Sequence, residues 1–247
     1  MRRGLIFVSC CLIASCKLHG SSGADAGSSG GLFSTLATLV SFEGEIEMKT
    51  KSGAGSFGVA TVFKIKGSKM RTELSALGTD YVSIMDMEGK KSISLDTKGH
   101  TYTETDLSAA SAAAKTKPKS TTKVVATNRK DVVAGYTCEI YEIQDLAGAG
   151  GPPVEICVAS GISMVAFGLS GPFSYFSKGG NDDAWGAVMS HGFPLRITMR
   201  DPKGAPIMTL EATRVEKKTE PDALFEVPAG YTKAPAPGTT LGPAGSP

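Results

Sequence analysis

Apolar and polar residues alternate along much of the chain, and this period of two predicts β-strands instead of helices. In segment 42–48, Phe42, Ile46 and Met48 alternate with three glutamates. Five further segments of this kind follow at hairpin spacing, at 57–65, 69–74, 81–87, 92–96 and 101–105. Turns containing glycine or polar residues separate them, so we expect an antiparallel meander of six short strands.

Segment 132–160 reads as two alternating runs joined by a Gly/Pro break at 148–153. Each run carries one cysteine, Cys138 in the first and Cys157 in the second. If the runs pair antiparallel about the break, the two cysteines face each other and a disulfide could lock the hairpin. The alternation also predicts that this hairpin is a central pair in the sheet.

The remaining segments are less regular. Segment 107–122, rich in Ala, Ser and Lys, predicts an exposed excursion. Segment 182–190 predicts a short helix, capped by one of two aspartates and with an apolar face. Strands are expected again at 195–200 and 207–215, and a single helical turn at 221–225.

The N-terminus predicts a bacterial lipoprotein signal. Arg2 and Arg3 form a basic region, a short apolar core follows, and segment 13–16 (Ile-Ala-Ser-Cys) has the small residues before a cysteine that a lipobox requires. The apolar run is too short for a permanent membrane span, so Cys16 is expected to become the lipidated first residue of the mature protein. The alternative is an ordinary secretory signal in which the cysteines are incidental.

These signals predict four parts. Residues 1–15 are the signal peptide, 16–31 the lipidated cysteine and a Gly/Ser/Ala-rich tether, 32–233 one β-rich domain that opens with a short helix at 32–40, and 234–247 a disordered tail.

Cleavage changes the charge and cysteine counts. Loss of Arg2 and Arg3 from 26 basic residues leaves 24 against 24 acidic ones, so no electrostatic argument for nucleic-acid binding remains. Of five cysteines, two leave with the signal and Cys16 is lipidated. Cys138 and Cys157 then remain as a pair in an oxidising compartment, where a disulfide is expected.

We find no catalytic or metal-binding motif and expect no enzyme and no cofactor. The three histidines, His19, His100 and His191, lack a Gly-x-Ser-x-Gly elbow and are expected to be surface or capping residues. Asp182, Asp183 and His191 could ligate a metal, but helix capping explains the aspartates. A basic tip formed by three lysines lies within 115–119 and lacks interleaved aromatic residues, so it is expected to be a solvated loop.

Methionine recurs on the predicted strands. Because its side chain is flexible and fills irregular apolar space, such strands suit a pocket for a flexible ligand; the alternative is an ordinary core poor in aromatics. The residues that we expect to line an apolar concave pocket are Phe42, Ile46, Met48, Phe63, Met70, Met85, Met87, Trp185 and Met199.

Three short motifs are spread along the chain: Phe-Glu-Gly-Glu-Ile at 42–46, Val-Ala-Gly-Tyr-Thr-Cys at 133–138 and Phe-x-Val-Pro-x-Gly-Tyr at 225–231. Together they resemble a family of exported bacterial proteins described as a domain of unknown function, which looks related to the LolA/LolB lipoprotein carriers. Where such relatives often carry tryptophan in the second strand of the hairpin, this chain has Cys157. The resemblance implies a mainly β (α+β) fold, a curved antiparallel half-barrel with a few short helices over its concave face, of the LolA-like kind, whose better-known members hold acyl chains.

Two functions follow as expectations. The first is a non-enzymatic lipoprotein of the cell envelope, anchored to a membrane by its N-terminal lipid, facing the periplasm and binding a lipid or acyl chain; of the two membranes, the outer is favoured. The alternative is a scaffold or sensory module that binds a protein partner, whose identity the sequence leaves unknown, through its sheet, segment 107–122 and an aromatic loop at 173–176.

Overall fold

The computed structural model describes residues 42–53, 55–76, 78–108, 122–145, 153–162 and 182–235. By contacts between residues the chain divides into Met1–Ala37 and Thr38–Pro247, and every described residue belongs to the second unit. The strands are β1 (Gly44–Ser52), β2 (Gly55–Lys66), β3 (Lys69–Ala76), β4 (Thr79–Asp86), β5 (Lys91–Asp96), β6 (Thr101–Asp106), β7 (Lys123–Val133), β8 (Tyr136–Gln144), β9 (Val154–Ala159), β10 (Phe193–Arg200), β11 (Pro206–Lys217) and β12 (Thr232–Lys233).

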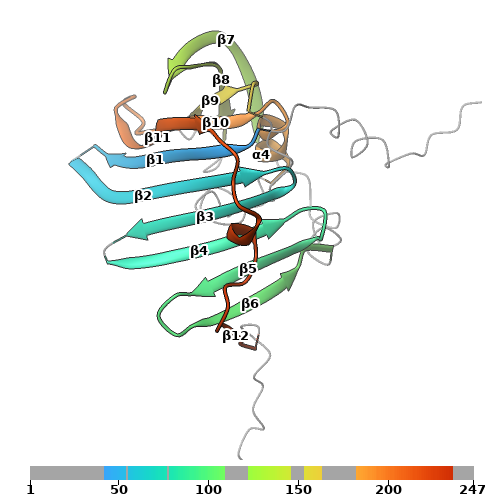
Figure 1. The fold of residues 1–247 in the computed structure, drawn as a ribbon. Coiled ribbons are helices and arrows are strands. Elements are labelled where there is room, and N and C mark those ends of the chain that lie inside the picture. Colours follow the sequence, from blue (N-terminus) through green and yellow to red (C-terminus); the bar gives the residue numbers. More distant parts are fainter. Residues whose placement is uncertain are drawn as a thin grey trace, which may run out of the picture. The chain divides into compact units, whose positions relative to one another are not determined.

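The strands form a single open sheet in the order β12-β6-β5-β4-β3-β2-β1-β11-β10-β9-β8-β7 (Figure 1). All neighbouring strands in this order pair antiparallel, with one exception: β12 pairs with β6 in parallel. The predicted six-strand meander and the mainly β, antiparallel character of the fold are therefore confirmed.

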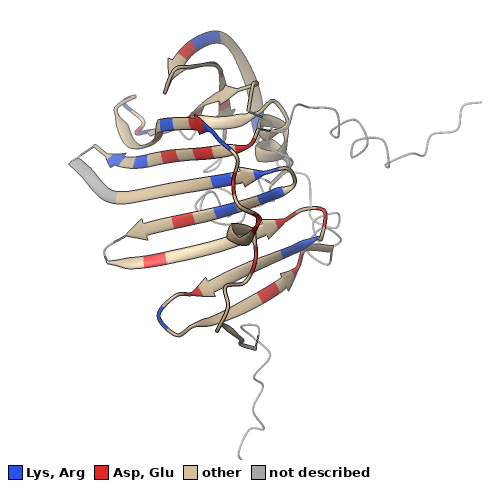
Figure 2. Ribbon diagram, in the orientation of Figure 1, with Lys and Arg blue, Asp and Glu red and all other residues tan. Residues whose placement is uncertain are grey.

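The two faces of the sheet differ, because successive residues of a strand point to opposite sides. On one, here called the inner face, Ile46, Phe63 and Ile197 are fully buried and join helix α4 (Asp182–Met189) in one hydrophobic cluster. On the other, the outer face, neighbouring residues such as Glu45 and Lys64 carry charge. Figure 2 shows charged residues of both signs along β1, β3 and β11, and lysines alone along β2.

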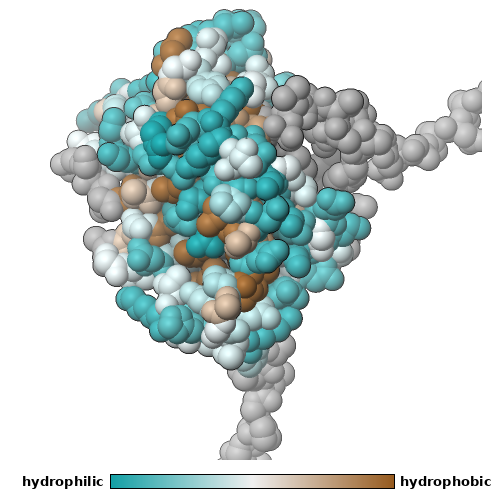
Figure 3. Space-filling view, in the orientation of Figure 1, coloured by the Kyte–Doolittle hydropathy of each residue, from teal (hydrophilic) through white to brown (hydrophobic). Residues whose placement is uncertain are grey.

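A C-terminal segment, residues 218–235, crosses the outer face, and we call it the strap. It contains the 3-10 turn η2 (Asp222–Phe225), which confirms the predicted single turn, and ends by pairing β12 with β6. Phe225 is buried in a second cluster with Val82 and Ile84 of β4 and with residues of β5. Figure 3 shows this face as largely hydrophilic, with hydrophobic residues gathered beside the strap.

The helices differ in part from the expectation of several short helices over the concave face. The predicted helix at 182–190 is present as α4, and its apolar residues Trp185, Val188 and Met189 are buried against the inner face. The turn η2 lies on the outer face instead, because Phe225 is directed into the second cluster. The helix predicted at 32–40 lies outside the described residues. No helix in the described part of the chain is long and apolar enough to cross a membrane.

The segment with the two cysteines requires a correction. Its first run is not one strand, because Ala134 and Gly135, both with positive φ, form a tight turn between β7 and β8. The pairs β7–β8 and β8–β9 also lie at one end of the sheet and not at its centre. A turn made by Ala-Gly lacks the Asn-Gly or Asp-Gly signature of such hairpins, so the pattern concealed it.

Candidate functional site

The nine residues predicted to line a pocket are brought together by the fold. Phe42, Ile46, Met48, Phe63, Met70, Met85 and Trp185 are buried members of the inner-face cluster, and Met87 and Met199 pack against it. Eight of them come from the sheet, its turns and the segment before β1, and Trp185 comes from α4. The alternation of the strands placed the strand members of this set on one face.

Aromatic rings form the centre of this cluster. The rings of Phe63 and Phe193 meet edge to face, with centroids 5.4 Å apart and planes at 74°, a favourable arrangement of aromatic quadrupoles. Met48 on β1, Met70 on β3 and Met85 on β4 are no more than 3% exposed. The inner face thus combines a rigid aromatic centre with flexible methionines.

The inner face also contains a polar anomaly. Thr61 is 1% exposed, and its Oγ1 has no hydrogen-bond partner. Its neighbours across the strands are Met48 on β1 and Leu74 on β3. Since buried hydroxyls normally form hydrogen bonds, this atom requires an explanation.

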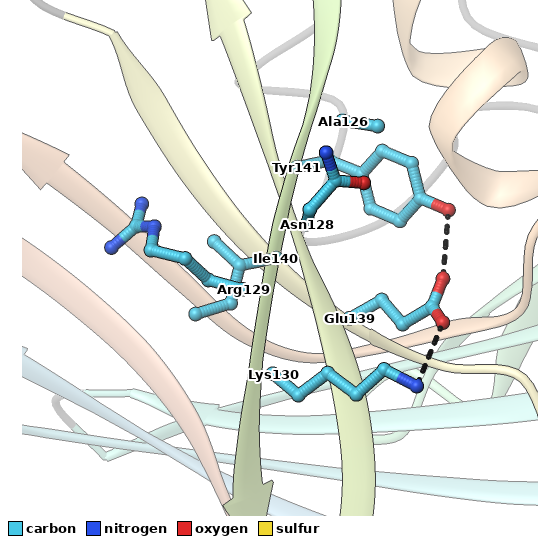
Figure 4. Close-up of a pocket in the computed structure, with 7 residues that line it drawn as sticks. All are labelled: Ala126, Asn128, Arg129, Lys130, Glu139, Ile140 and Tyr141. Atoms are coloured by element: carbon cyan, nitrogen blue, oxygen red, sulfur yellow. Dashed lines mark hydrogen bonds and ion pairs between the residues drawn. The ribbon is translucent and has the colours of Figure 1, made fainter.

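A small hollow of about 110 Å³ lies at the bulge in β7, where the register with β8 shifts between Ala126 and Arg129 (Figure 4). Thr127 donates a hydrogen bond to the carbonyl of Ile140 at 2.6 Å, and Asn128 has φ of 58°. The residues that line it are Ala126, Asn128, Arg129, Lys130, Glu139, Ile140 and Tyr141. Sequence analysis missed this hollow, because a bulge leaves no mark on the alternation.

Three polar side chains of the hollow, Lys130, Glu139 and Tyr141, contact one another. Tyr141 donates a hydrogen bond to Glu139 at 3.3 Å, and Lys130 Nζ lies 3.5 Å from the same carboxylate. Burial, followed by the charge of Glu139 and this hydrogen bond, raises the pKa of Tyr141, so the phenol stays protonated. Figure 4 shows Arg129 directed to the opposite side of the hairpin, where it binds Glu142 and Glu155. The hollow is also small beside the 300–1,000 Å³ of ordinary ligand pockets.

Several charges of the outer face form ion pairs with one another. Arg214 of β11 forms ion pairs with Glu45, Glu47 and Glu216. Its hydrogen bond lowers the pKa of Glu47, against the opposing effect of burial. On β3, burial raises the pKa of Glu73, but hydrogen bonds from Arg71 and Lys64 outweigh it, so the net shift is downward. These ion pairs neutralise Glu45, Glu47, Glu73 and Arg214 on the outer face.

The described histidines make aromatic contacts. His191 stacks on Tyr141 with ring centroids 4.8 Å apart, and His100 lies 5.4 Å from the ring of Tyr231. No group of three or more His, Cys, Asp or Glu in the described ranges could hold a metal. The side chains of Asp182 and Asp183 lie outside the described part of the chain.

The structure contains the Cys138–Cys157 disulfide. The two Cα atoms are 5.3 Å apart and both cysteines are 1% exposed. In the β8–β9 register Cys157 lies opposite Ile140, so the bond is diagonal and does not join facing positions. The sequence predicted the bond with the two cysteines directly opposite each other. In the structure Cys138 lies two residues along β8 from the position opposite Cys157.

Several predicted features lie outside the described residues: the lipobox with Cys16, the tether, His19, the lysines within 115–119, the aromatic loop at 173–176 and most of the tail. They stay predictions.

Solved structures similar to this chain include PNGF-II, at TM-score 0.45 and 12% identity. That match covers 78% of this chain and 31% of PNGF-II. The matched part is thus about a third of that protein. An uncharacterised conserved protein from Thermus thermophilus matches at TM-score 0.42 and 8% identity, over 82% of this chain and 96% of that one. MucB matches at TM-score 0.37 and 12% identity, over 80% of this chain and 62% of MucB.

No curated protein matches the chain by sequence. The model of one family, described as a domain of unknown function (DUF4412), matches residues 42–231. This range contains strands β1 to β11 and the three motifs on which the resemblance is based. The chain belongs to the DUF4412 family.

Proposed function

We propose that this chain is a membrane-tethered, non-enzymatic lipoprotein of the bacterial envelope that holds a lipid or acyl chain against the inner face of its sheet. The observation that carries the proposal is the apolar cluster on that face, which includes three buried methionines of the sheet and has three more packed against it at Met87, Met199 and Met208. A face of this kind can accommodate a ligand with no fixed shape, because methionine has several rotatable bonds and a polarisable sulfur.

The size of the apolar face suits an acyl chain. From β4 to β10 it extends across six neighbouring strands in the order β4-β3-β2-β1-β11-β10. With strands about 4.8 Å apart, this width is about 24 Å. The acyl chains of one bilayer leaflet span about 15 Å, half of the hydrocarbon core, so one such chain fits across the face.

Helix α4 provides a cover at one end of this face. Its eight residues span about 12 Å, and its own Trp185 is fully buried. A ligand would lie between α4 and the sheet and displace methionine side chains, at a small cost in packing because they repack readily.

Native mass spectrometry of mature protein released from membranes tests the proposal. We expect a co-purifying lipid, and the variant Met199→Gln should reduce its occupancy because the polar amide would face the acyl chain. The matched control is Ile207→Gln on β11, where the native side chain is 48% exposed and occupancy should be unchanged. Protein that is always empty, together with a solid core in solution, would overturn the proposal.

The alternative function, a module that binds a protein partner, is favoured by one observation. Strand β7 ends the sheet order, and its Val132 and Val125 are 63% and 37% exposed. Edge strands with exposed apolar residues can pair with a strand of a partner. Crosslinking in intact cells from position 132 would detect such a partner, and crosslinks that occur equally from an exposed position on β6 would count against it.

A further inference from the structure

The inner face changes from apolar to hydroxyl-bearing between β2 and β6. One row of directly paired residues crosses these strands as Phe63, Thr72, Ser83, Ser94 and Thr103. Residues directly opposite in antiparallel strands point to the same face, so all five side chains share the inner face with Phe63. Four consecutive strands thus present a hydroxyl at the same level, and we call these four residues the hydroxyl row.

A second row runs parallel to the first and makes the same change. Its members, from β2 to β6, are Ile65, Met70, Met85, Ser92 and Thr105. The apolar part ends at Phe63 in the first row and at Met85 in the second. The boundary between apolar and polar positions therefore crosses the inner face at β3 to β5.

Burial of the hydroxyl row decreases from β3 to β6. Thr72 and Ser83 are buried, at 2% and 8% exposed, whereas Ser94 and Thr103 are half-buried. The hydroxyls become more accessible toward β6, at the far end of the sheet from β7. A ligand with its apolar part at the centre of the face would have its other end at these accessible hydroxyls.

The hydroxyls are not used to bind one another. Ser94 Oγ lies 3.1 Å from the hydroxyl of Tyr81. Within the described part of the chain no side-chain hydrogen bond involves Thr72, Ser83 or Thr103. Serine and threonine pairs in a sheet commonly stabilise it by bonding across the strands, and that explanation does not apply to this row. Thr61 Oγ1, buried in the adjoining apolar part, also lacks a partner.

The polar part of the inner face is almost free of charge. The charged residues of β3 to β6 fall on the outer face by register, with the exception of Asp96 at the end of β5. Asp96 is occupied by the turn after it, since its carboxylate accepts hydrogen bonds from the backbone N–H groups of Lys98 and Gly99 at 3.0 Å. Among the described residues of β3 to β6, a charged head group would find no free counter-ion on this face, and burying an unpaired charge is costly.

We propose that the hydroxyl row binds the uncharged, hydroxyl-bearing head of an amphiphile, a glycerol or sugar group, while the hydrocarbon part lies on Phe63, Met70 and Met85. Hydroxyls donate and accept hydrogen bonds, and so match a head group that does the same. This inference rests on the proposed acyl-chain binding and deepens it by naming the chemistry of the head.

Three probes with the same acyl chain test the inference on the mature protein: monolauroylglycerol, laurate and lauroylcholine. Their heads are neutral with hydroxyls, anionic and cationic. Binding is followed by calorimetry and by the fluorescence of Trp185, the one tryptophan of the chain. We expect monolauroylglycerol to bind about tenfold more tightly than either charged probe, because it keeps two or three hydrogen bonds and needs no counter-ion.

Variants separate the head from the chain. Ser83→Ala together with Ser94→Ala should weaken monolauroylglycerol about tenfold and leave laurate unchanged, since each lost hydrogen bond is worth a few-fold in affinity. Thr72→Val, which keeps the shape of the side chain, should have a smaller effect of the same kind. The control is Ser75→Ala on the outer face of β3, where the native hydroxyl binds Asp80.

The outcomes distinguish the two proposals. If none of the three probes binds, acyl-chain binding is wrong and this inference fails with it. If all three bind equally and the hydroxyl variants bind like the wild type, acyl-chain binding stands and the assignment of the hydroxyl row is wrong.

Discussion

Lys66 Nζ on β2 lies 2.9 Å from Asp222 Oδ1 on the strap. The same amine donates a hydrogen bond to the carbonyl oxygen of Glu220 at 2.8 Å, and Arg71 Nη1 on β3 reaches the carbonyl of Leu224 at 3.2 Å. The strap is thus held by side chains of the sheet that bind its backbone as well as its carboxylate. Because Phe225 follows at once, these contacts position the ring over the second cluster.

The ion pair predicts a pH window for closure of the strap. The hydrogen bond and the charge of Lys66 hold the pKa of Asp222 below its ordinary 3.8, and the hydrogen bond to Asp222 raises the pKa of Lys66 above 10.5 despite desolvation of the amine. A lowered carboxyl pKa stabilises the folded state above 3.8, and this contribution is lost as the pH falls through the lowered value. The contribution of Lys66 is present below pH 10.5 and is lost as the pH rises through its raised pKa.

Hydrogen exchange at the strap measures this window. The amides of Thr232 and Ala234, bonded to the carbonyls of His100 and Tyr102, should exchange faster at pH 3 than at pH 6 after correction for intrinsic rates. In Asp222→Asn the difference should shrink, while Glu226→Gln, which removes another carboxylate of the strap, should behave like the wild type. Equal pH dependence in all three proteins would contradict the role of this ion pair.

Phe225 is expected to provide most of the stability of the strap. It is 5% exposed and packs with Val82, Ile84, Ile93 and Leu95, so Phe225→Ala should lower the free energy of unfolding by about 3 kcal/mol. Urea denaturation measures this change. Leu224→Ala, at a half-buried neighbour, should cost less, and a larger loss at Leu224 would show that the ring is not the anchor.

The strap also shows how far sequence reasoning reached. The closing motif at 225–231 was recognised, and η2 was predicted, because both are local. Its path over β4 and β5 was not predicted, since that depends on contacts between residues far apart in the chain. The aliphatic residues of β4 and β5 that pack around Phe225 are typical of any strand, and their alternation does not indicate which face the strap covers.

The candidate site, too, could be predicted from the sequence only in part. Period-two alternation placed Phe63, Met70 and Met85 on one face correctly, because the hairpins between them are tight. The hydroxyl row depends on register across four strands, and register is set by turn geometry that the sequence indicates only loosely. The hollow at β7 depends on a bulge, which shifts the register at Ala126 without changing the pattern of residue types.

The disulfide should be the principal constraint on the β8–β9 pair. It joins residues separated by 19 positions, for which the chain-entropy model gives about 3 kcal/mol of stability. The double variant Cys138→Ala and Cys157→Ala should lose about this amount in urea denaturation. Thiol labelling of native, non-reduced mature protein should find neither cysteine reactive, and two labelled thiols would rule the bond out.

Gly44 should tolerate no side chain. Its φ is 148°, and a Cβ built there would collide with the carbonyl oxygen of Glu216 on β11. Gly44→Ala should therefore lower the free energy of unfolding by about 2 kcal/mol or more, through backbone strain and separation of β1 from β11. Gly67→Ala is the matched control, because Gly67 has φ of 56° but open space around it and should cost about 1 kcal/mol from strain alone.

Cys16→Ala should release the protein from the membrane fraction. The prediction depends on the lipobox at 13–16, since acyl chains on a mature N-terminal cysteine give stable anchoring where a single chain gives only reversible binding. Fractionation of cells followed by detection of the protein measures the change. Cys11→Ala, in the segment that the predicted cleavage would remove, should leave the protein on the membrane. Unchanged membrane association of Cys16→Ala would mean that the lipobox assignment is wrong and that an ordinary secretory signal, with attachment by other means, replaces it.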